Sequence, residues 1–238
     1  LAHVPDIVGF ATACRRLLAD DGVASFEFQY LGELISQTEF DTIYHEHFSY
    51  LSLTAAEAVL EAAGLTVFEV ERLTTHGGSL RVYAQVAGGR GLPVARSVDL
   101  LRAEEAELGL RTSFFYSGFQ SRVDLIRDQL RSFLIDARNE GRTVVGYGAA
   151  AKGNTLLNYA GVGPDLVRYV VDNNPAKQGH YLPGSHIPIV EEHRIAEDQP
   201  DFVLILPWNL RDEIKYRLES LGGWSGSMVT AIPKLIID

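Results

Sequence analysis

The stretch RTVVGYGAAAKGNTLLNYAG, residues 142–161, decides the fold class of this chain. Its first part, RTVVGYG, is rich in β-forming residues and predicts a strand, whereas AAAKGNTLLNYAG predicts a helix that ends at a glycine. The alternation continues with two strands, a helix and a last strand, at 165–172, 201–207, 209–223 and 227–238. Because strands that alternate with helices indicate a parallel sheet, residues 142–238 are predicted to form a Rossmann-like parallel α/β domain.

Upstream of this domain the pattern is helical from Ser97 to Gly141, and SFFYSGF near its middle predicts a break between two helices. The glycine- and proline-containing stretch 87–95 is the best linker candidate. The predicted organisation is therefore a first domain at 1–88, a linker with connecting helices at 89–141, and the Rossmann-like domain at 142–238.

Residues 1–88 read as the end of another α/β sheet. A helix is predicted after Pro5 and Asp6, and a second helix at 53–64 with Thr54 as its cap and Glu57 three residues on. Strands are predicted at 23–30, 65–73 and 79–87, and the last two are expected to pair antiparallel because only TTHGG separates them.

Composition excludes several classes of function. The 21 basic and 31 acidic residues give a formal charge of −10, so no broad footprint for nucleic acid or anionic membrane is expected. No apolar run reaches the roughly 18 residues that span a bilayer. Cys14 is the single cysteine, which excludes an internal disulfide and a multi-cysteine metal site and favours a reducing, cytoplasmic setting. The oligomeric state is not fixed by the sequence.

Two predicted loops contain many titratable and hydrogen-bonding side chains. YHEHFSY, residues 44–50, places two imidazoles, a carboxylate and two phenols together on an irregular connection, and HGGSLR, 76–81, follows a predicted hairpin turn. Aromatic and histidine clusters also occur as packing at the mouth of a sheet, with their polar tips hydrogen-bonded. The residues alone therefore leave both a structural and a chemical interpretation open.

Four motifs in order resemble the sugar C-methyltransferase family: YHEHFSYLS, THGGSLRVY, GYGAAAKGNTLLNY and VVDNNPAKQGHYLPGSHIPI. These enzymes use S-adenosylmethionine to methylate a carbon of a keto-deoxysugar carried on a nucleoside diphosphate. The resemblance implies a class I methyltransferase sheet, of which this chain holds the end, followed by the Rossmann-like domain. It also implies a zinc module and a glycine-rich donor-binding loop upstream of Leu1, and no zinc site within this chain. No G-x-G-x-x-G sequence precedes residue 90, as this placement requires.

The resemblance assigns roles to the first motifs. Carbon methylation requires removal of a proton next to the ketone and stabilisation of the enolate oxygen, for which an imidazole and phenol or carboxyl groups are suited. His47 is predicted to be the base, with Tyr44 and Glu46 assisting. His76 and Ser79 are predicted to contact the substrate.

The loop at 146–154 is the second predicted site. Gly146, Gly148 and Lys152 are expected to hold the diphosphate of the nucleotide sugar at a helix N-terminus, and Asp172 ends the next strand near the position of a ribose-binding carboxylate. The spacing also fits two alternatives: an NAD site, or glycines that only permit close packing of strand and helix.

The predicted activity is thus C-methylation of a nucleotide-linked keto-deoxysugar, and the isolated chain is expected to be inactive without the donor-binding segment. Two other functions remain open at this point: an NAD-dependent sugar-nucleotide enzyme using Gly146, Gly148 and Asp172, and a non-catalytic sugar-nucleotide-binding module.

Overall fold

The computed structural model describes residues 1–89 and 91–238 and divides the chain into two compact units. Unit 1 contains residues 1–36 and 45–118, and unit 2 contains residues 37–44 and 119–238. Of the predicted linker, Arg90 lies outside the described residues. The chain therefore contributes one short segment, 37–44, to unit 2 long before the rest of that unit begins.

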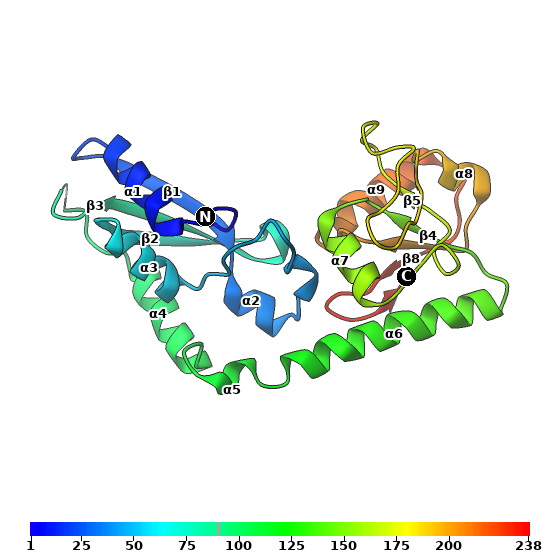
Figure 1. Cartoon of the computed structure of the whole chain (residues 1–238), viewed down its shortest axis with the longest axis horizontal. Helices are drawn as coiled ribbons and strands as arrows, with labels where there is room; N and C mark the ends of the chain where they lie inside the picture. The colour runs from blue at the N-terminus through cyan, green and yellow to red at the C-terminus, as the bar shows by residue number, and fades with distance from the viewer. Residues whose placement is uncertain (90) are drawn as a thin grey trace. The chain divides into compact units, whose positions relative to one another are not determined.

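Unit 1 is built on an antiparallel sheet with the order β1-β3-β2 (Figure 1). The strands are β1 (Val23–Gln29), β2 (Leu65–Leu73) and β3 (Ser79–Val86). The predicted antiparallel pairing of the second and third strands is confirmed, since Leu73 lies opposite Ser79 in the register. On one face Arg81 lies opposite both Glu27 and Glu71, and its Nη2 is 2.9 Å from Glu27 Oε2. Because this face of the sheet is charged, the hydrophobic core packs against the opposite face.

The helices of unit 1 follow the apolar periodicity of the sequence. They are α1 (Ile7–Leu17), α2 (Leu31–Ser36), α3 (Leu53–Ala62), α4 (Arg96–Leu108) and α5 (Ser113–Tyr116). The helix start predicted after Pro5 and Asp6 is confirmed, and Asp6 caps α1 by accepting from the Gly9 amide at 2.8 Å. The prediction that Thr54 caps α3 is wrong: Ser52 is the N-cap, and Thr54 binds Glu105 instead. Helices α1, α3 and α4 share one apolar cluster with the inner face of the sheet.

Unit 2 contains a six-stranded sheet with the order β6-β5-β4-β7-β8-β9. The strands are β4 (Val144–Tyr147), β5 (Val170–Val171), β6 (Ile189–Val190), β7 (Phe202–Ile205), β8 (Ser227–Thr230) and β9 (Ile236–Ile237). All neighbours are parallel except β8 and β9, so the predicted parallel α/β sheet is confirmed for five of the strands. The prediction of one strand over 227–238 is wrong. The chain reverses around Pro233, which has no amide hydrogen to donate to a ladder.

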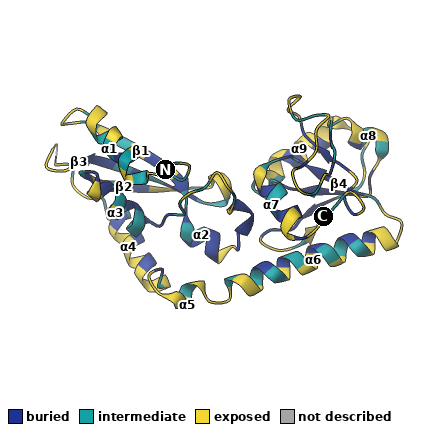
Figure 2. Cartoon of the chain, viewed as in Figure 1, coloured by how far each residue is buried: buried dark blue, intermediate teal, exposed yellow. Residues whose placement is uncertain are grey.

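Helices cover both faces of this sheet, as Figures 1 and 2 show. One face packs against α6 (Phe119–Asn139) and α7 (Ala151–Tyr159), and the other against α8 (Arg194–Asp198) and α9 (Arg211–Leu221). The buried residues of α6 lie along one side of the helix, at Val123, Ile126, Leu130, Leu134 and Ala137. Such a stripe is the expected signature of a helix that lies on a sheet.

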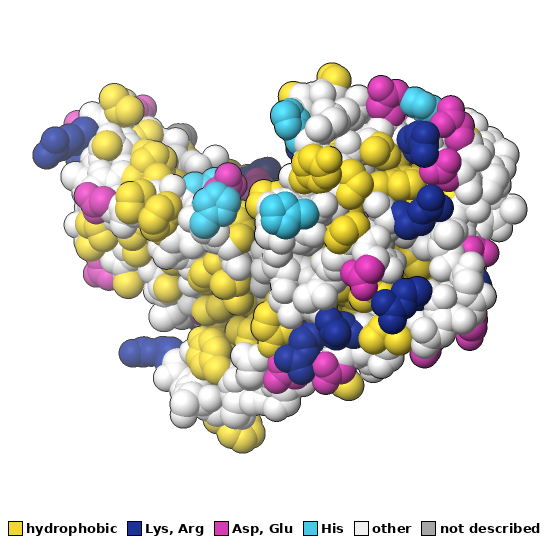
Figure 3. All heavy atoms as spheres, turned by 45° about the vertical axis from the view of Figure 1, so that its right-hand side comes forward, with side chains coloured by type: hydrophobic (Ala, Val, Ile, Leu, Met, Phe, Trp, Pro, Cys, Tyr) yellow, Lys and Arg dark blue, Asp and Glu magenta, His cyan; other side chains and the backbone are white. Residues whose placement is uncertain are grey.

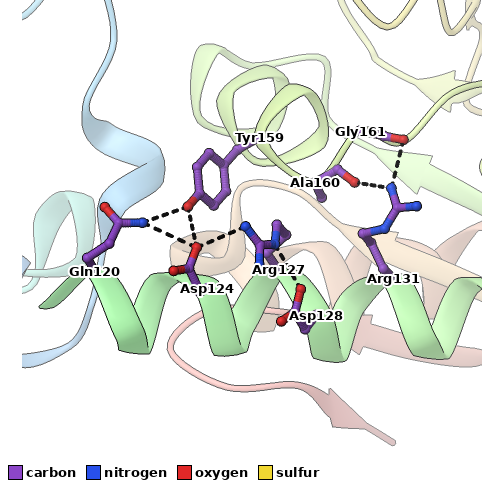
Figure 4. Close-up of polar contacts among 8 residues, drawn as sticks. All are labelled: Gln120, Asp124, Arg127, Asp128, Arg131, Tyr159, Ala160 and Gly161. Carbon is purple, nitrogen blue, oxygen red and sulfur yellow. Dashed lines mark hydrogen bonds and ion pairs between the residues drawn. The ribbon is translucent and has the colours of Figure 1, made fainter. Parts of the chain in front are cut away.

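A polar cluster ties α6 to α7 at the end of α7 (Figure 4). The Tyr159 hydroxyl donates to Asp124 Oδ1 at 2.6 Å and accepts from Gln120 Nε2 at 2.7 Å. Arg127 Nη1 donates to the same Asp124 oxygen at 2.9 Å, and Arg131 Nη1 donates to the Ala160 carbonyl at 2.6 Å. These bonds fix the Tyr159 ring, which packs at 5.3 Å against Phe40 of the short segment that unit 2 receives early in the chain.

Candidate functional site

The predicted base, His47, lies on a loop in unit 1 and keeps part of its ring open to solvent. The His3 ring stacks on it, with centroids 4.9 Å apart and planes inclined by 14°. Tyr50 meets it edge-on at 5.8 Å. The Phe48 amide donates to the Ala2 carbonyl at 2.8 Å, so residues 2 and 3 are bound to the loop along their backbone as well. The imidazole is thus held by two rings without being sealed into an apolar core.

His3 is a residue that the sequence analysis missed. It stands 44 positions before His47, so no local pattern connects the two residues. The available signal was weak: His3 lies two residues before Pro5, on a segment that precedes the first predicted helix, and functional residues are often found on loops.

The other predicted residues of this motif divide between the two units. Tyr44 is partly buried and belongs to unit 2, whereas Glu46 lies exposed in a turn of unit 1 next to the exposed His45. The assisting roles of Tyr44 and Glu46 remain predictions.

The second motif forms a tight turn between β2 and β3. His76 and the two glycines after it have positive φ, with 58° at His76. Positive φ is uncommon for a residue with a side chain, and histidine is one of the types that tolerate it. The His76 side chain is exposed, whereas Ser79 is buried and its Oγ donates to the Thr75 carbonyl at 3.0 Å. His76 is therefore the more accessible of the two predicted substrate contacts.

In unit 2, Asp172 is bonded to the loop that follows β4. Its Oδ2 accepts from the Ala149 amide at 2.8 Å and from Lys177 Nζ at 3.0 Å, and its Oδ1 accepts from the Asn174 amide at 2.9 Å. A carboxylate has about four acceptor sites. Three are used within the unit, so this carboxylate already serves to shape the loop.

The glycines of the same loop allow close packing. A Cβ on Gly146 would lie 2.8 Å from the Val170 side chain, and one on Gly148 would lie 2.6 Å from Pro207 Cδ. Gly148 also has φ of 89°, a conformation that favours glycine. The structural alternative raised for these glycines therefore accounts for both of them.

A cavity of about 670 Å³ opens where β4, β5 and β7 end. Gly148, Asp172, Lys177, Pro207 and Arg217 are among the residues in its wall. This is the topological switch point of the sheet, where ligands bind in open α/β folds, and the volume is typical of a small-molecule site.

The charges at this cavity are balanced. Asp172 and Glu213 in the wall offset Lys177 and Arg217, and Arg217 is bound in addition by Glu192 at 2.5 and 2.7 Å. On the face shown in Figure 3, acidic and basic side chains are likewise interspersed over unit 2. The cavity therefore suits the weakly charged part of a ligand better than a bare polyphosphate.

Lys152 does not line this cavity. Its side chain is 9% exposed, and Nζ lies 4.7 Å from the centre of the Trp208 ring and 3.2 Å from Asn209 Oδ1. Burial lowers the pKa of Lys152, and the charges of Asp41 and Glu39 oppose that shift. Lys152 thus belongs to a buried charge cluster with Asp41.

No group of three or more His, Cys, Asp or Glu side chains placed to hold a metal ion occurs within residues 1–89 and 91–238. Within the same ranges no helix has the length and apolar character needed to cross a membrane.

Comparison with known proteins relates this chain to C-methyltransferases. The family model for the C-methyltransferase C-terminal domain matches residues 74–233. The C-methyltransferase NovU of Streptomyces niveus is 38% identical over 233 residues, which cover 98% of this chain and 55% of that protein. The chain therefore spans about half the length of this curated relative.

Proposed function

Because the chain belongs to the C-methyltransferase family, we propose that the full-length protein methylates a carbon of a nucleoside-diphosphate-linked keto-deoxysugar, with S-adenosylmethionine as the donor. The donor supplies an electrophilic methyl group on a sulfonium. No described residue of this chain is assigned to the donor, since the glycine-rich strand–loop–helix that would hold it is not found before residue 90. The chain's own residues are proposed to generate the carbon nucleophile.

The observation that carries this proposal is the setting of His47. A neutral imidazole can accept a proton near neutral pH, and the stacked His3 and edge-on Tyr50 rings restrict its orientation. In the proposed step His47 removes a proton from the carbon next to the ketone, and the electron pair left behind forms the enolate. Tyr44 donates a hydrogen bond to the enolate oxygen, and Glu46 assists. The enolate carbon then takes the methyl group, the carbon–sulfur bond of the donor breaks to leave a neutral thioether, and the ketone is restored.

The cavity of unit 2 is the proposed site for the nucleoside end of the substrate. Gly148 and Asp172 belong to its wall, and its volume accommodates a nucleoside with part of the diphosphate. Gly146 supports it from within β4, and His76 and Ser79 are proposed to contact the sugar. The three hydrogen bonds already made by Asp172 disfavour the competing NAD site, in which that carboxylate would have to bind ribose hydroxyls.

The proposed function is tested by measuring proton exchange at the sugar carbon next to the ketone. The full-length protein is incubated with the keto-sugar nucleotide in deuterated buffer without donor, and deuterium incorporation is followed by NMR. His47→Ala is expected to slow both exchange and methylation by about 10²- to 10⁴-fold. His45→Ala is the matched control, because it removes an exposed imidazole two residues away and is expected to leave both rates unchanged. Exchange at the wild-type rate in His47→Ala would remove the assignment of the base.

A second measurement separates this function from its alternatives. Titration calorimetry of the chain with thymidine diphosphate and with NADH is expected to show binding of the first and none of the second. Saturable NADH binding would favour the dehydrogenase-type alternative. Nucleotide binding combined with wild-type methylation by His47→Ala would leave the chain as a binding module.

A further inference from the structure

The segment 37–44 is held in unit 2 at several points. Thr38 is buried with φ of 56°, an unusual value for a β-branched residue, and its Oγ1 accepts from Arg122 Nε at 3.0 Å. Phe40 joins the apolar cluster of unit 2 and packs against Tyr159. Strained backbone of this kind persists only where the surroundings impose it. The segment is therefore fixed to unit 2, and Tyr44 is its last residue.

The centre of this attachment is charged. Asp41 is fully buried and its Oδ2 accepts from Trp208 Nε1 at 2.8 Å, while its Oδ1 accepts no hydrogen bond from the described part of the chain. The Lys152 ammonium lies over the ring of the same tryptophan. Buried charged groups are seldom more stabilising than apolar residues of similar volume, so Asp41 and Lys152 point to a requirement for defined geometry at this place.

The same short turn also shapes the cavity. Trp208 and Asn209, which contact Asp41 and Lys152, lie in the 3₁₀ turn η3 (Trp208–Leu210). Pro207 just before this turn and Leu210 at its end line the cavity at the end of β7. The turn η3 thus contacts segment 37–44 and also forms part of the wall of the proposed nucleotide site.

We propose that Asp41, Lys152 and Trp208 are positioning residues for the transfer reaction: they fix Tyr44 relative to the nucleotide cavity of unit 2. The inference rests on the proposed function, because it requires Tyr44 to act on the bound sugar. Without these contacts segment 37–44 retains Phe40 in the apolar cluster and the hydrogen bond from Arg122 to Thr38, but it loses the hydrogen bond that fixes Asp41, three residues before Tyr44. The Tyr44 hydroxyl then no longer meets the enolate oxygen at hydrogen-bonding distance.

A double-mutant cycle on the full-length protein tests this. Asp41→Ala and Trp208→Phe are each expected to lower kcat by about 10- to 100-fold with little change in KM, since a displacement of one ångström suffices for such a loss. In a Tyr44→Phe background the same substitutions are expected to lower kcat by less than about threefold, because residues that act as a unit are not additive. Asp41→Asn retains an acceptor for Trp208 and is expected to recover most of the activity.

Controls separate positioning from folding. Thermal unfolding is measured for every variant, and kcat is determined well below the unfolding transition. Glu105→Gln is the matched control, because Glu105 is an equally buried carboxylate that binds backbone amides of α3 in unit 1. It is expected to lower stability without lowering kcat.

Two results overturn the inference: wild-type kcat in both Asp41→Ala and Trp208→Phe, or equal losses in the wild-type and Tyr44→Phe backgrounds. If Tyr44→Phe and His47→Ala are themselves fully active, the proposed function fails instead.

Discussion

Trp208 Nε1 donates a 2.8 Å hydrogen bond to Asp41 Oδ2, although the two residues are 167 positions apart. Burial raises the pKa of Asp41 to about 6, while the charge of Lys152 and this hydrogen bond act to lower it. The carboxylate therefore has one hydrogen-bond donor and the nearby charge of Lys152 in a place that disfavours its own charge. The protonation of Asp41 therefore changes the free energy of unfolding by a measurable amount.

We expect the free energy of unfolding to fall as the pH rises between about 4 and 6. In the unfolded chain the pKa of an aspartate is about 3.9, so in this window the native protein binds more protons than the unfolded chain. The loss attributable to Asp41 is about 3 kcal/mol by linkage. Urea unfolding at a series of pH values, followed by tryptophan fluorescence, measures it against Asp41→Asn, in which this dependence is absent.

Asp201→Asn removes a carboxylate whose contribution to stability has the opposite pH dependence to that of Asp41. The hydrogen bond from the Thr143 amide lowers the pKa of Asp201, so its stabilising contribution is lost as the pH falls through that lowered value. Parallel stability curves for the wild type and Asp41→Asn would contradict the assignment to Asp41.

Removing the positive charge of Lys152 is expected to destabilise unit 2. Lys152→Met leaves the Asp41 carboxylate buried without its countercharge and should cost about 3 kcal/mol. The double variant Asp41→Asn/Lys152→Met is expected to be more stable than the sum of the single changes indicates, because it removes both charges. The two tryptophans, Trp208 and Trp224, both lie in unit 2 and report its unfolding.

Lys177→Met is the control for this cycle. Lys177 pairs with Asp172 at 3.0 Å, but its side chain is 40% exposed, so the loss should stay within about 1 kcal/mol. Strict additivity of Asp41→Asn and Lys152→Met would show that the two side chains do not act as a pair.

Glu105 is predicted to stabilise unit 1 by holding the start of α3. Its Oε1 accepts from the Leu53 amide at 2.6 Å, and its Oε2 accepts from the Thr54 amide at 3.0 Å and from Thr54 Oγ1 at 2.6 Å. These donors would be left buried without an acceptor in Glu105→Ala, at a cost of about 2 to 4 kcal/mol. Hydrogen exchange of the α3 amides measures the loss.

The neighbouring Glu104 is the control, because it is 46% exposed and pairs with Arg72 at the surface. Glu104→Ala should change stability by less than about 1 kcal/mol. Equal exchange rates in the wild type and Glu105→Ala would show that Ser52 alone is sufficient to cap the helix.

The sequence pattern predicted those parts of the fold that depend on local periodicity. The hairpin formed by 65–73 and 79–87 and the parallel sheet of unit 2 followed from alternation and from the order of strands and helices. The cap of α3 was misplaced by two residues, because Ser52 and Thr54 are both good capping types and a distant carboxylate, Glu105, decides between them.

The candidate site was less predictable because its contacts join distant residues. No local sequence pattern indicates that Asp41 accepts a hydrogen bond from Trp208, or that the rings of His3 and His47 stack. Lys152 was expected at a phosphate because it follows a glycine-rich turn, yet its side chain is buried beside Trp208. A lysine side chain near a helix N-terminus can point toward a ligand or into the protein. The packing of the rest of unit 2 selects the second direction for Lys152.

Gly148 provides the clearest test of whether the loop after β4 needs its glycines for packing. Alanine there would have φ near 89° and a Cβ 2.6 Å from Pro207 Cδ, so both strain and overlap oppose it. Gly148→Ala should therefore lower the free energy of unfolding by about 2 to 4 kcal/mol. Gly179→Ala has a similar φ of 79° but nothing within 4 Å of the new Cβ, and should cost only about 1 to 2 kcal/mol. Because Pro207 lines the cavity, Gly148→Ala should also weaken thymidine diphosphate binding, whereas Gly179→Ala should not. Urea unfolding and calorimetry on both variants measure these differences, and equal losses of stability would show that Pro207 yields to the added methyl group.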